Sequence, residues 1–227
     1  MTWNVVHLAD VAPTPWKNGG GTTRELVAWP DEKQWVWRMS VAEVTQRGPF
    51  SRFDGAQRWF SVLSGAGVAL SSGGQRNMLT LDSAPFCFDG GEHTVCDLLD
   101  GPTQDFNLMT RSAGNVVDKS VAAGQTHARA TVARVRGDSE MNFRESSNAI
   151  ITIAIYSIST WANAIFNDEI DRIVPGSLVW RTVSAHDHLR VEAQDALLMQ
   201  IDVVAIPLRH ASEAPKSPPA TRKDTSS

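Results

Sequence analysis

Short apolar segments that recur between turn-forming residues are the feature of this sequence that most restricts its fold. Runs rich in Val, Ile, Trp and Phe alternate with Gly, Pro, Asp and Ser, which is typical of closely spaced β-strands. No window of about a dozen residues keeps an apolar period of 3.6 without an interrupting Gly or Pro. The sequence therefore predicts a mainly β protein. The expected strands are Thr22–Trp29, Trp35–Val44, Trp59–Leu63, Gly67–Leu70, Thr94–Leu99, Phe106–Met109, Ile150–Ser159, Ser177–Val183 and Leu197–Ile206.

The middle of the chain indicates a connection between two β-rich halves. Residues 113–147 are rich in Ala, Gly, Ser and single charges, with room for one strand. We expect an N-terminal half over 1–112 and a C-terminal half over 113–209, stacked against each other. Residues 210–227 are proline-rich and polar and bury too little apolar surface to offset their ordering entropy, so we expect them to be disordered.

Composition excludes several classes of function. Hydrophobic residues make up 42% and charged residues 20% of the 227 residues, and no apolar run approaches the roughly 20 residues that a membrane span needs. The net charge is −4 and basic residues are scattered singly, so nucleic acid is not an expected partner. The first residues do not form a secretory signal, which favours a cytoplasmic location. Cys87 and Cys96 are then expected to be reduced core thiols.

Three consecutive glycines near the start of the chain need a physical reason. The segment Pro15–Glu25, PWKNGGGTTRE, places them after a tryptophan, a lysine and an asparagine. Successive glycines serve positive φ angles or the close approach of another group. A phosphate-binding loop places Lys and Ser or Thr after its last glycine, whereas Lys17 precedes the glycines here. A bend that leads into an edge strand, and a bend that brings side chains to a pocket, both remain open.

Strand alternation decides which polar side chains share a face. Arg24 and Glu25 point to opposite faces of one strand, and we favour Arg24 as the inward side chain. On the next expected strand Arg38 and Ser40 lie opposite an apolar face. A strand with one buried face and one solvated face explains the same pattern without a ligand.

A second polar pair follows a turn in the segment Gly101–Met109. Asp105, Asn107 and Met109 share one face, opposite Phe106 and Leu108. Two short polar side chains beside a methionine indicate a partly enclosed surface. Structural hydrogen bonding at the end of a strand is the competing explanation, since Asp and Asn commonly satisfy turn amides.

Six motifs in order give the chain a resemblance to the HutD/Ves family. After PWKNGGGTTRE they are WRMSVAEV (37–44), GPFSRFDGAQR (48–58), VLSGAG (62–67), PFCFDG (85–90) and LLDGPTQDFNLM (98–109). The resemblance covers about the first half of the chain. The sequence departs from the family pattern after the last motif. The family pattern has paired arginines there, whereas this chain has Met109-Thr110-Arg111-Ser112.

The resemblance implies a cupin-like double-stranded β-helix in a bicupin arrangement, with two β-barrel halves in one chain. It also implies a link to histidine utilisation or stress response, no firmly assigned catalytic activity and no cofactor. The implied ligand is a small carboxylate such as formylglutamate or urocanate. The implied pocket residues are Trp16, Asn18, Arg24, Arg38, Arg58, Asp105 and Asn107.

The chemistry of these residue types fits a small acid. An arginine offers a planar fork of donors to a carboxylate, while asparagine both donates and accepts. Trp16 can form one wall of a pocket. Lone arginines in β-proteins are also commonly surface or structural ion pairs, here with Glu25, Glu43 or Asp105.

A cupin-like fold raises the question of a metal site. His186, His188 and Glu192 have the local spacing of cupin metal ligands, and alternation puts them on one strand face. Leu189 and Val191 on the opposite face look like the core side, which turns the histidines outward. We therefore predict no metal site and keep these three residues as weak candidates.

Two alternatives to a metabolite-binding protein stay open. One is a metal-dependent cupin enzyme acting on a small organic acid. The other is a structural β-protein that assembles through its strand edges, and a homodimer of either kind is possible. Nucleophilic catalysis has little support, because no Gly-x-Ser-x-Gly element occurs and the single tyrosine, Tyr156, lies in an apolar strand.

Overall fold

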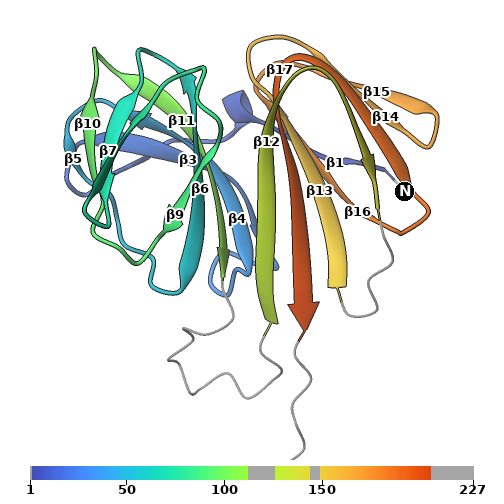
Figure 1. Cartoon of the computed structure of the whole chain (residues 1–227), viewed down its shortest axis with the longest axis horizontal. Helices are drawn as coiled ribbons and strands as arrows, with labels where there is room; N and C mark the ends of the chain where they lie inside the picture. The colour runs from blue at the N-terminus through green and yellow to red at the C-terminus, as the bar shows by residue number, and fades with distance from the viewer. Residues whose placement is uncertain (1, 112–125, 144–148, 206–227) are drawn as a thin grey trace, which may run out of the picture.

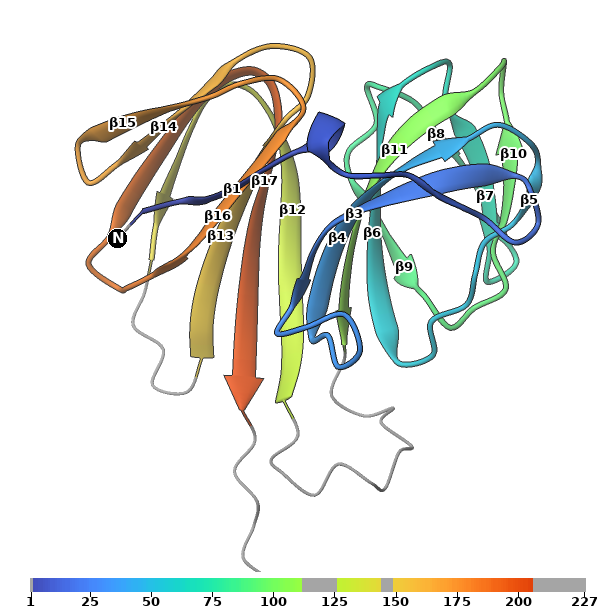
Figure 2. The same cartoon turned by 180° about the vertical axis from the view of Figure 1, so that it is seen from behind.

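The protein is mainly β, as the sequence predicts, in a computed structural model that describes residues 2–111, 126–143 and 149–205. Two β assemblies lie side by side (Figure 1, and from behind in Figure 2). Outside the strands, the regular helical structure in the described residues is the short 3-10 helix Leu8–Asp10. None of the described helices has the length and apolar character to cross a membrane. The expected disordered tail, 210–227, falls outside the described residues.

One assembly contains two antiparallel sheets. The larger has the order β2-β3-β4-β11-β6-β9, and the smaller has the order β5-β10-β7-β8. Their strands are β2 (Thr14–Pro15), β3 (Gly21–Trp29), β4 (Trp37–Val44), β5 (Gly48–Pro49), β6 (Ala56–Ser64), β7 (Val68–Ser72), β8 (Gln75–Leu79), β9 (Phe86–Asp89), β10 (Val95–Leu98) and β11 (Thr103–Arg111).

The other assembly is a seven-stranded sheet with the order β1-β16-β13-β17-β14-β15, in which β12 also pairs with β17. The first strand of the chain belongs to it, because β1 pairs with β16, and the N-terminus in Figure 1 lies beside this assembly. Its strands are β1 (Asn4–His7), β12 (Thr126–Asn142), β13 (Ala149–Ser157), β14 (Ala162–Phe166), β15 (Glu169–Ile173), β16 (Ser177–Val183) and β17 (His188–Ala205).

The expected strands all coincide with observed ones, but two observed strands are much longer than expected. The strand expected from Leu197 begins nine residues earlier, at His188. The middle segment contributes β12, whose 17 residues pair with β17 through a bulge next to Gly137. Gly137 has a φ of 115°, a conformation that favours glycine. The bulge lets this long strand bend over the sheet.

Four apolar clusters form the core of the described residues, and the smallest of them joins Trp35, Ala56 and Met109. One fills the space between the two assemblies and includes Trp37 and Met39 of β4 together with Tyr156 and Met199 of the seven-stranded sheet. A second lies within the seven-stranded sheet, and a third lies between the two smaller sheets. The face of β4 opposite Trp37 and Met39 is therefore turned toward the inside of the first assembly.

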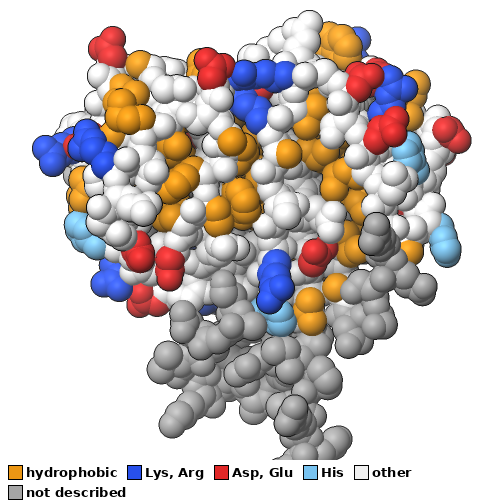
Figure 3. Space-filling view, viewed as in Figure 1, with side chains coloured by type: hydrophobic (Ala, Val, Ile, Leu, Met, Phe, Trp, Pro, Cys, Tyr) orange, Lys and Arg blue, Asp and Glu red, His pale blue; other side chains and the backbone are white. Residues whose placement is uncertain are grey.

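The surface shown in Figure 3 mixes charges of both signs. Lys and Arg side chains lie next to Asp and Glu side chains on the described part of this face, and neither sign forms a continuous field there. Five of the ion pairs that the structure contains join exposed arginines to acidic groups: Arg47–Asp97, Arg52–Asp54, Arg76–Asp97, Arg136–Asp82 and Arg190–Asp138. Such exposed pairs contribute little to stability.

Candidate functional site

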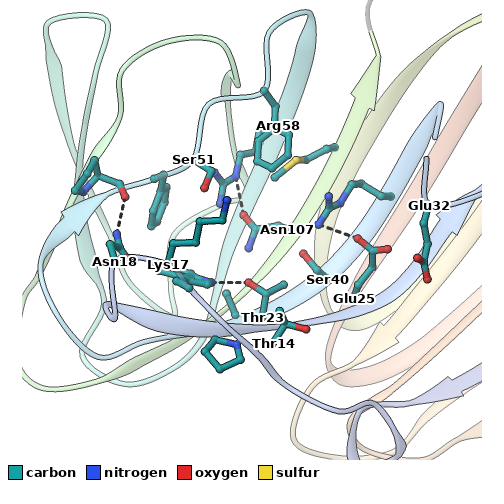
Figure 4. Close-up of a pocket in the computed structure, with 18 residues that line it drawn as sticks. Thr14, Lys17, Asn18, Thr23, Glu25, Glu32, Ser40, Ser51, Arg58 and Asn107 are labelled. Carbon is teal, nitrogen blue, oxygen red and sulfur yellow. Dashed lines mark hydrogen bonds and ion pairs between the residues drawn. The ribbon is translucent and has the colours of Figure 1, made fainter. Parts of the chain in front are cut away.

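A cavity of about 750 Å³ opens on the inner face of the six-stranded sheet. Its floor comes from alternate residues of neighbouring strands, because directly opposed residues of an antiparallel pair share a face. Glu25, Ser40 and Asn107 form one such row. Arg38, Met109 and Arg58 form the next row. The walls come from two loop segments, Thr14–Asn18 and Pro49–Phe53 (Figure 4).

Arg58 is the most buried cation of the cavity. Its side chain is 6% exposed and its guanidinium lies 4.5 Å from the ring of Phe50 and 5.5 Å from the ring of Phe88. Its Nε donates to Asn107 Oδ1 at 2.8 Å. Burial lowers the pKa of Arg58 to about 10, against the opposing charge of Asp105. Arg58 is therefore positively charged at neutral pH, and cation–π contacts supply part of its environment.

Asp105 lies beneath this pair rather than on the cavity wall. Its side chain is fully buried, and its Oδ1 accepts a hydrogen bond from Asn107 Nδ2 at 2.6 Å. Burial raises the pKa of Asp105 to about 7, although Arg58 and the hydrogen bond from Asn107 lower it. Asp105, Asn107 and Arg58 thus form one connected chain of polar side chains.

Arg38 is the second cation of the cavity, and it already has an acidic partner. Its Nη2 lies 2.9 Å from Glu25 Oε2, and its guanidinium lies over the rings of Phe53 and Trp35 at 5.4 and 5.8 Å. Its Nε is buried without a hydrogen-bond partner. Lys17 points toward Arg58 from the opposite wall in Figure 4. The cavity therefore combines two guanidinium groups and an ammonium group with two carboxylates, of which Glu25 is paired with Arg38 and Glu32 lines the wall.

The glycine segment forms one wall of the cavity. Trp16 donates from Nε1 to Thr23 Oγ1 at 2.7 Å and packs edge-on against Phe50. Asn18 Oδ1 accepts the amide hydrogen of Gly20 at 3.0 Å, and Asn18 Nδ2 donates to the Pro49 carbonyl at 3.4 Å. These contacts fix the bend across the mouth of the cavity.

Two of the three glycines have separate physical reasons. Gly19 has a φ of 72°, which glycine adopts without steric cost. A Cβ at Gly21 would lie 2.2 Å from the carbonyl oxygen of Glu43 and 3.2 Å from the ring of Trp16. The bend therefore requires glycine once for its backbone angle and once for close packing.

We expect Gly21→Ala to lower the free energy of unfolding by about 1–3 kcal/mol, the usual cost of overpacking. The added methyl group meets backbone of β4, which shifts only together with the sheet. Gly48→Ala is the matched control, because its Cβ would lie 3.6 Å from its nearest neighbour, an ordinary contact. Urea denaturation of both variants measures the difference, and equal costs for the two variants would contradict this explanation of Gly21.

Five of the seven residues named from the sequence line this cavity, and two do not. Trp16, Asn18, Arg38, Arg58 and Asn107 line it, and Asp105 lies below it. The choice of Arg24 over Glu25 as the inward side chain was wrong. Arg24 Nε donates to the Val11 carbonyl at 2.9 Å and Nη1 lies 3.5 Å from Glu43. Arg24 therefore lies on the opposite face of β3, where backbone and acidic partners satisfy it.

Sequence reasoning missed several lining residues. Thr23 and Glu25 follow from alternation once the inward face of β3 is known. Lys17, Glu32 and Ser51 come from loops, where no periodicity indicates the direction of a side chain. All five line the cavity.

The weak metal candidates do not come together. His186 lies in the turn before β17, whereas His188 begins that strand. Glu192 is 2.8 Å from Arg190 Nη2 and accepts a hydrogen bond from Asn163. Within the described ranges 2–111, 126–143 and 149–205, no three His, Cys, Asp or Glu side chains are placed to hold a metal ion. Leu189 and Val191 lie on the opposite face of the strand, and both are fully buried, as strand alternation indicates.

Of the two cysteines and the single tyrosine, Cys96 and Tyr156 are buried and Cys87 is half-buried. Burial raises the pKa of Cys87 to about 11, and burial together with Asp105 and Asp97 raises the pKa of Cys96 to about 12. Both cysteines are free thiols. Tyr156 packs against Phe106 in the core between the assemblies, and burial raises its pKa to about 12. None of the three lines the cavity.

Comparison with known proteins assigns the family. The HutD family model matches residues 8–204. This chain belongs to the HutD family. The resemblance predicted from the six motifs is thereby confirmed, and the match extends over both β assemblies of this HutD-family chain.

Curated relatives match this HutD-family chain over about half of their own length. A protein of Pseudomonas putida described as an uncharacterized 21.2 kDa protein in the hutC 3′ region is 40% identical over 107 residues, which are 46% of this chain and 56% of the relative. Protein Ves of Cronobacter sakazakii is 39% identical over 98 residues, or 42% of this chain and 54% of the relative. The chain thus spans about half the length of the curated relatives it matches.

Solved structures resemble the HutD-family chain over nearly all of it. HutD from Pseudomonas fluorescens, described in a formate condition, has a TM-score of 0.68 and 25% identity, covering 90% of this chain and 99% of that one. A conserved protein of unknown function from Pseudomonas aeruginosa has a TM-score of 0.72 and 25% identity, covering 90% and 100%. Salicylate 1,2-dioxygenase from Pseudoaminobacter salicylatoxidans shares the fold alone, at a TM-score of 0.52 and 10% identity over 88% of this chain and 81% of that one.

Proposed function

We propose that this HutD-family chain binds a small acidic metabolite, formylglutamate-like or urocanate-like, in the cavity beside Arg58. We further propose that it regulates histidine utilisation or a stress response from the cytoplasm, without a catalytic step of its own. One observation carries the binding proposal. Arg58 is buried, makes one hydrogen bond to a neutral amide, and has no ion pair within 4 Å among the described residues.

A carboxylate fits this environment for electrostatic reasons. A buried guanidinium that faces only an amide and aromatic rings keeps unused N–H donors, and these match the two oxygens of a carboxylate. Ser40 and Asn107 add neutral donors and acceptors on the same face. Lys17 and Arg38 lie on the same cavity and favour a second anionic or polar group on the ligand. The name of the Pseudomonas putida relative supports the link to histidine utilisation.

We also propose that the two β assemblies are the two cupin-like halves of a bicupin, divided near residue 112 except that β1 joins the C-terminal assembly. The likeness to cupin-like dioxygenase structures supports the fold of the assemblies. The alternative of a metal-dependent enzyme has no supporting group of ligands in the described residues.

Thermal unfolding tests the binding proposal. Protein whose metal content has been measured is heated with formylglutamate, urocanate, histidine or glutamate. A ligand that binds the folded protein raises the midpoint of thermal unfolding by mass action. We expect Arg58→Ala to weaken binding roughly 10- to 100-fold, the usual worth of hydrogen bonds to a charged group. Arg24→Ala is the matched control, because it removes an arginine from the outer face of the same sheet.

The comparison uses the ligand-induced shift of each variant rather than its absolute midpoint, since Arg58→Ala also leaves a gap in the core. Arg58→Lys keeps a charge without the planar fork and is expected to give an intermediate shift. Shifts that are the same in wild type, Arg58→Ala and Arg24→Ala would place the acid elsewhere. No shift with any of the four acids would reject the proposed function.

A further inference from the structure

A fully buried carboxyl group lies directly under the cavity. One oxygen of Asp105 accepts the hydrogen bond from Asn107, while Oδ2 is buried without a hydrogen-bond partner. A carboxylate in this position is desolvated and only partly compensated. A merely structural side chain gains nothing from such a position, because an apolar residue of the same size fills it at lower cost.

The orientation of Asn107 joins Asp105 to Arg58. The Nε–H of Arg58 is only a donor, so the atom of Asn107 that meets it at 2.8 Å must be the amide oxygen. The amide nitrogen then faces Asp105, at 2.6 Å. A change in the charge of Asp105 is therefore transmitted to Arg58 through one side chain as well as through space.

The surroundings of Asp105 are otherwise apolar. Its cross-strand neighbours are Ala42 on β4 and Val62 on β6. The ionisable group whose charge acts on it is Arg58 on β6, and Asp105 in turn raises the pKa of the Cys96 thiol on β10. The pKa of Cys96, about 12, keeps that thiol protonated at neutral pH. Arg58 is thus the cation that acts on Asp105 directly, while Arg38 and Lys17 add positive charge to the same cavity.

We propose that Asp105 is a proton-coupled counterion of Arg58, ionised while the cavity is empty and protonated when an anion binds at Arg58. The inference rests on the proposed binding of a small acid. An incoming carboxylate would bring a second negative charge to the guanidinium whose charge favours the ionised form of Asp105, and a nearby like charge disfavours the ionised form of a buried carboxyl group. A proton from solvent converts Asp105 to the neutral acid and restores the balance of one cation and one anion.

The position of the protonation equilibrium of Asp105 supports this coupling. With its pKa near 7, Asp105 exchanges its proton within the physiological range, and a bound anion raises that pKa further. Below about pH 6 the group is already neutral, so binding needs no proton. Above about pH 7 each anion that binds also requires a proton, so affinity falls by up to tenfold per pH unit. The eighteen residues that line the cavity include no histidine to produce the same effect.

Calorimetric titration with formylglutamate, glutamate and urocanate tests the coupling. At pH 7.5, the heats of binding measured in phosphate and in Tris differ in proportion to the number of protons taken up, because the two buffers ionise with different enthalpies. We expect a clear fraction of one proton per site for wild type and none for Asp105→Asn, with the ligand's own titration removed by subtraction. Asp105→Asn is also expected to bind with an affinity that stays level from pH 6 to 8.5.

The empty protein gives a second readout. The pKa of Asp105 is higher in the folded protein than its ordinary value of 3.8, so the folded state holds this proton more tightly than the unfolded state does. Its contribution to stability is fully present below about pH 4 and is lost as the pH rises through 7. Asp105→Asn is expected to lack this decline in urea denaturation.

The outcomes separate the two proposals. If a probe acid binds near Arg58 with no proton uptake in wild type, the coupling is wrong and the binding function stands. Uptake that persists unchanged in Asp105→Asn also overturns the coupling. If none of the probe acids binds, both proposals fall. Wild-type uptake decides the question by itself if Asp105→Asn does not fold.

Discussion

Trp37→Ala is expected to lower the free energy of unfolding by about 3–5 kcal/mol, the usual cost of truncating a buried tryptophan. Trp37 is 1% exposed and lies in the cluster between the two assemblies, where it stacks on Trp29 with an interplanar angle of 7°. Removing the indole opens a cavity at the contact between the sheets. Because both sheets contribute to this cluster, neither closes the gap alone.

A conservative variant separates packing from hydrogen bonding. The indole N–H of Trp37 is buried without a partner, so Trp37→Phe removes an unsatisfied donor and keeps most of the ring. We expect Trp37→Phe to cost less than about 1.5 kcal/mol. Trp161→Ala is the exposed control and is expected to stay within about 0.5 kcal/mol. Urea denaturation measures all three, and similar costs at Trp37 and Trp161 would show that the interface cluster is not the source of stability.

Arg134→Ala is expected to cost about 3 kcal/mol, near the lower end of the range for breaking a buried ion pair. Arg134 donates from Nε and Nη2 to both carboxylate oxygens of Asp195 at 2.6 Å. Its Nη1 also donates to the carbonyl of Val62 on β6 at 2.8 Å. We expect a cost near the lower end of this range because Asp195 is partly exposed and keeps a second partner, with Arg136 Nε 3.6 Å from its Oδ1. The variant leaves a carboxylate and a carbonyl without their main donor.

The control for Arg134 is an exposed arginine on the same sheet. Arg190 pairs with Asp138 and Glu192, and its side chain is 40% exposed. Arg190→Ala is expected to cost far less than Arg134→Ala, because exposed ion pairs contribute little to stability. In a double-mutant cycle, Arg134→Ala with Asp195→Ala should be less destabilising than the sum of the single changes. Additive costs would mean that the two side chains act independently.

Strand positions were predictable from the sequence because one face of each strand is apolar. The alternation that separates Arg38 and Ser40 from Trp37 and Met39 is present in the structure, with the tryptophan and the methionine in the core. Period two says which residues share a face. It does not say which face meets a cavity, and for this reason Arg24 was preferred to Glu25.

Other features depend on contacts between distant segments. The bulge between Glu25 and Val27 has no local signal in the sequence. The great length of β12 depends on its pairing with β17, which no local composition reveals. Asp105 was correctly grouped with Asn107, but its depth below the cavity follows from how β6 and β10 close over it. Local pattern therefore predicts faces, and tertiary packing decides which faces hold a site.

The pairing of β1 with β16 makes the order of synthesis matter for folding. Asn4 and Trp180 are partners in this pair, so β1 is synthesised long before its partner strand, which follows more than 170 residues later. Contacts of such long sequence separation form late, because the intervening chain must first be ordered. The segment Thr14–Asn18 follows β1 after the short 3-10 helix Leu8–Asp10 and forms a wall of the cavity. A nascent chain therefore anchors the stretch that leads into this wall only when the far assembly captures β1.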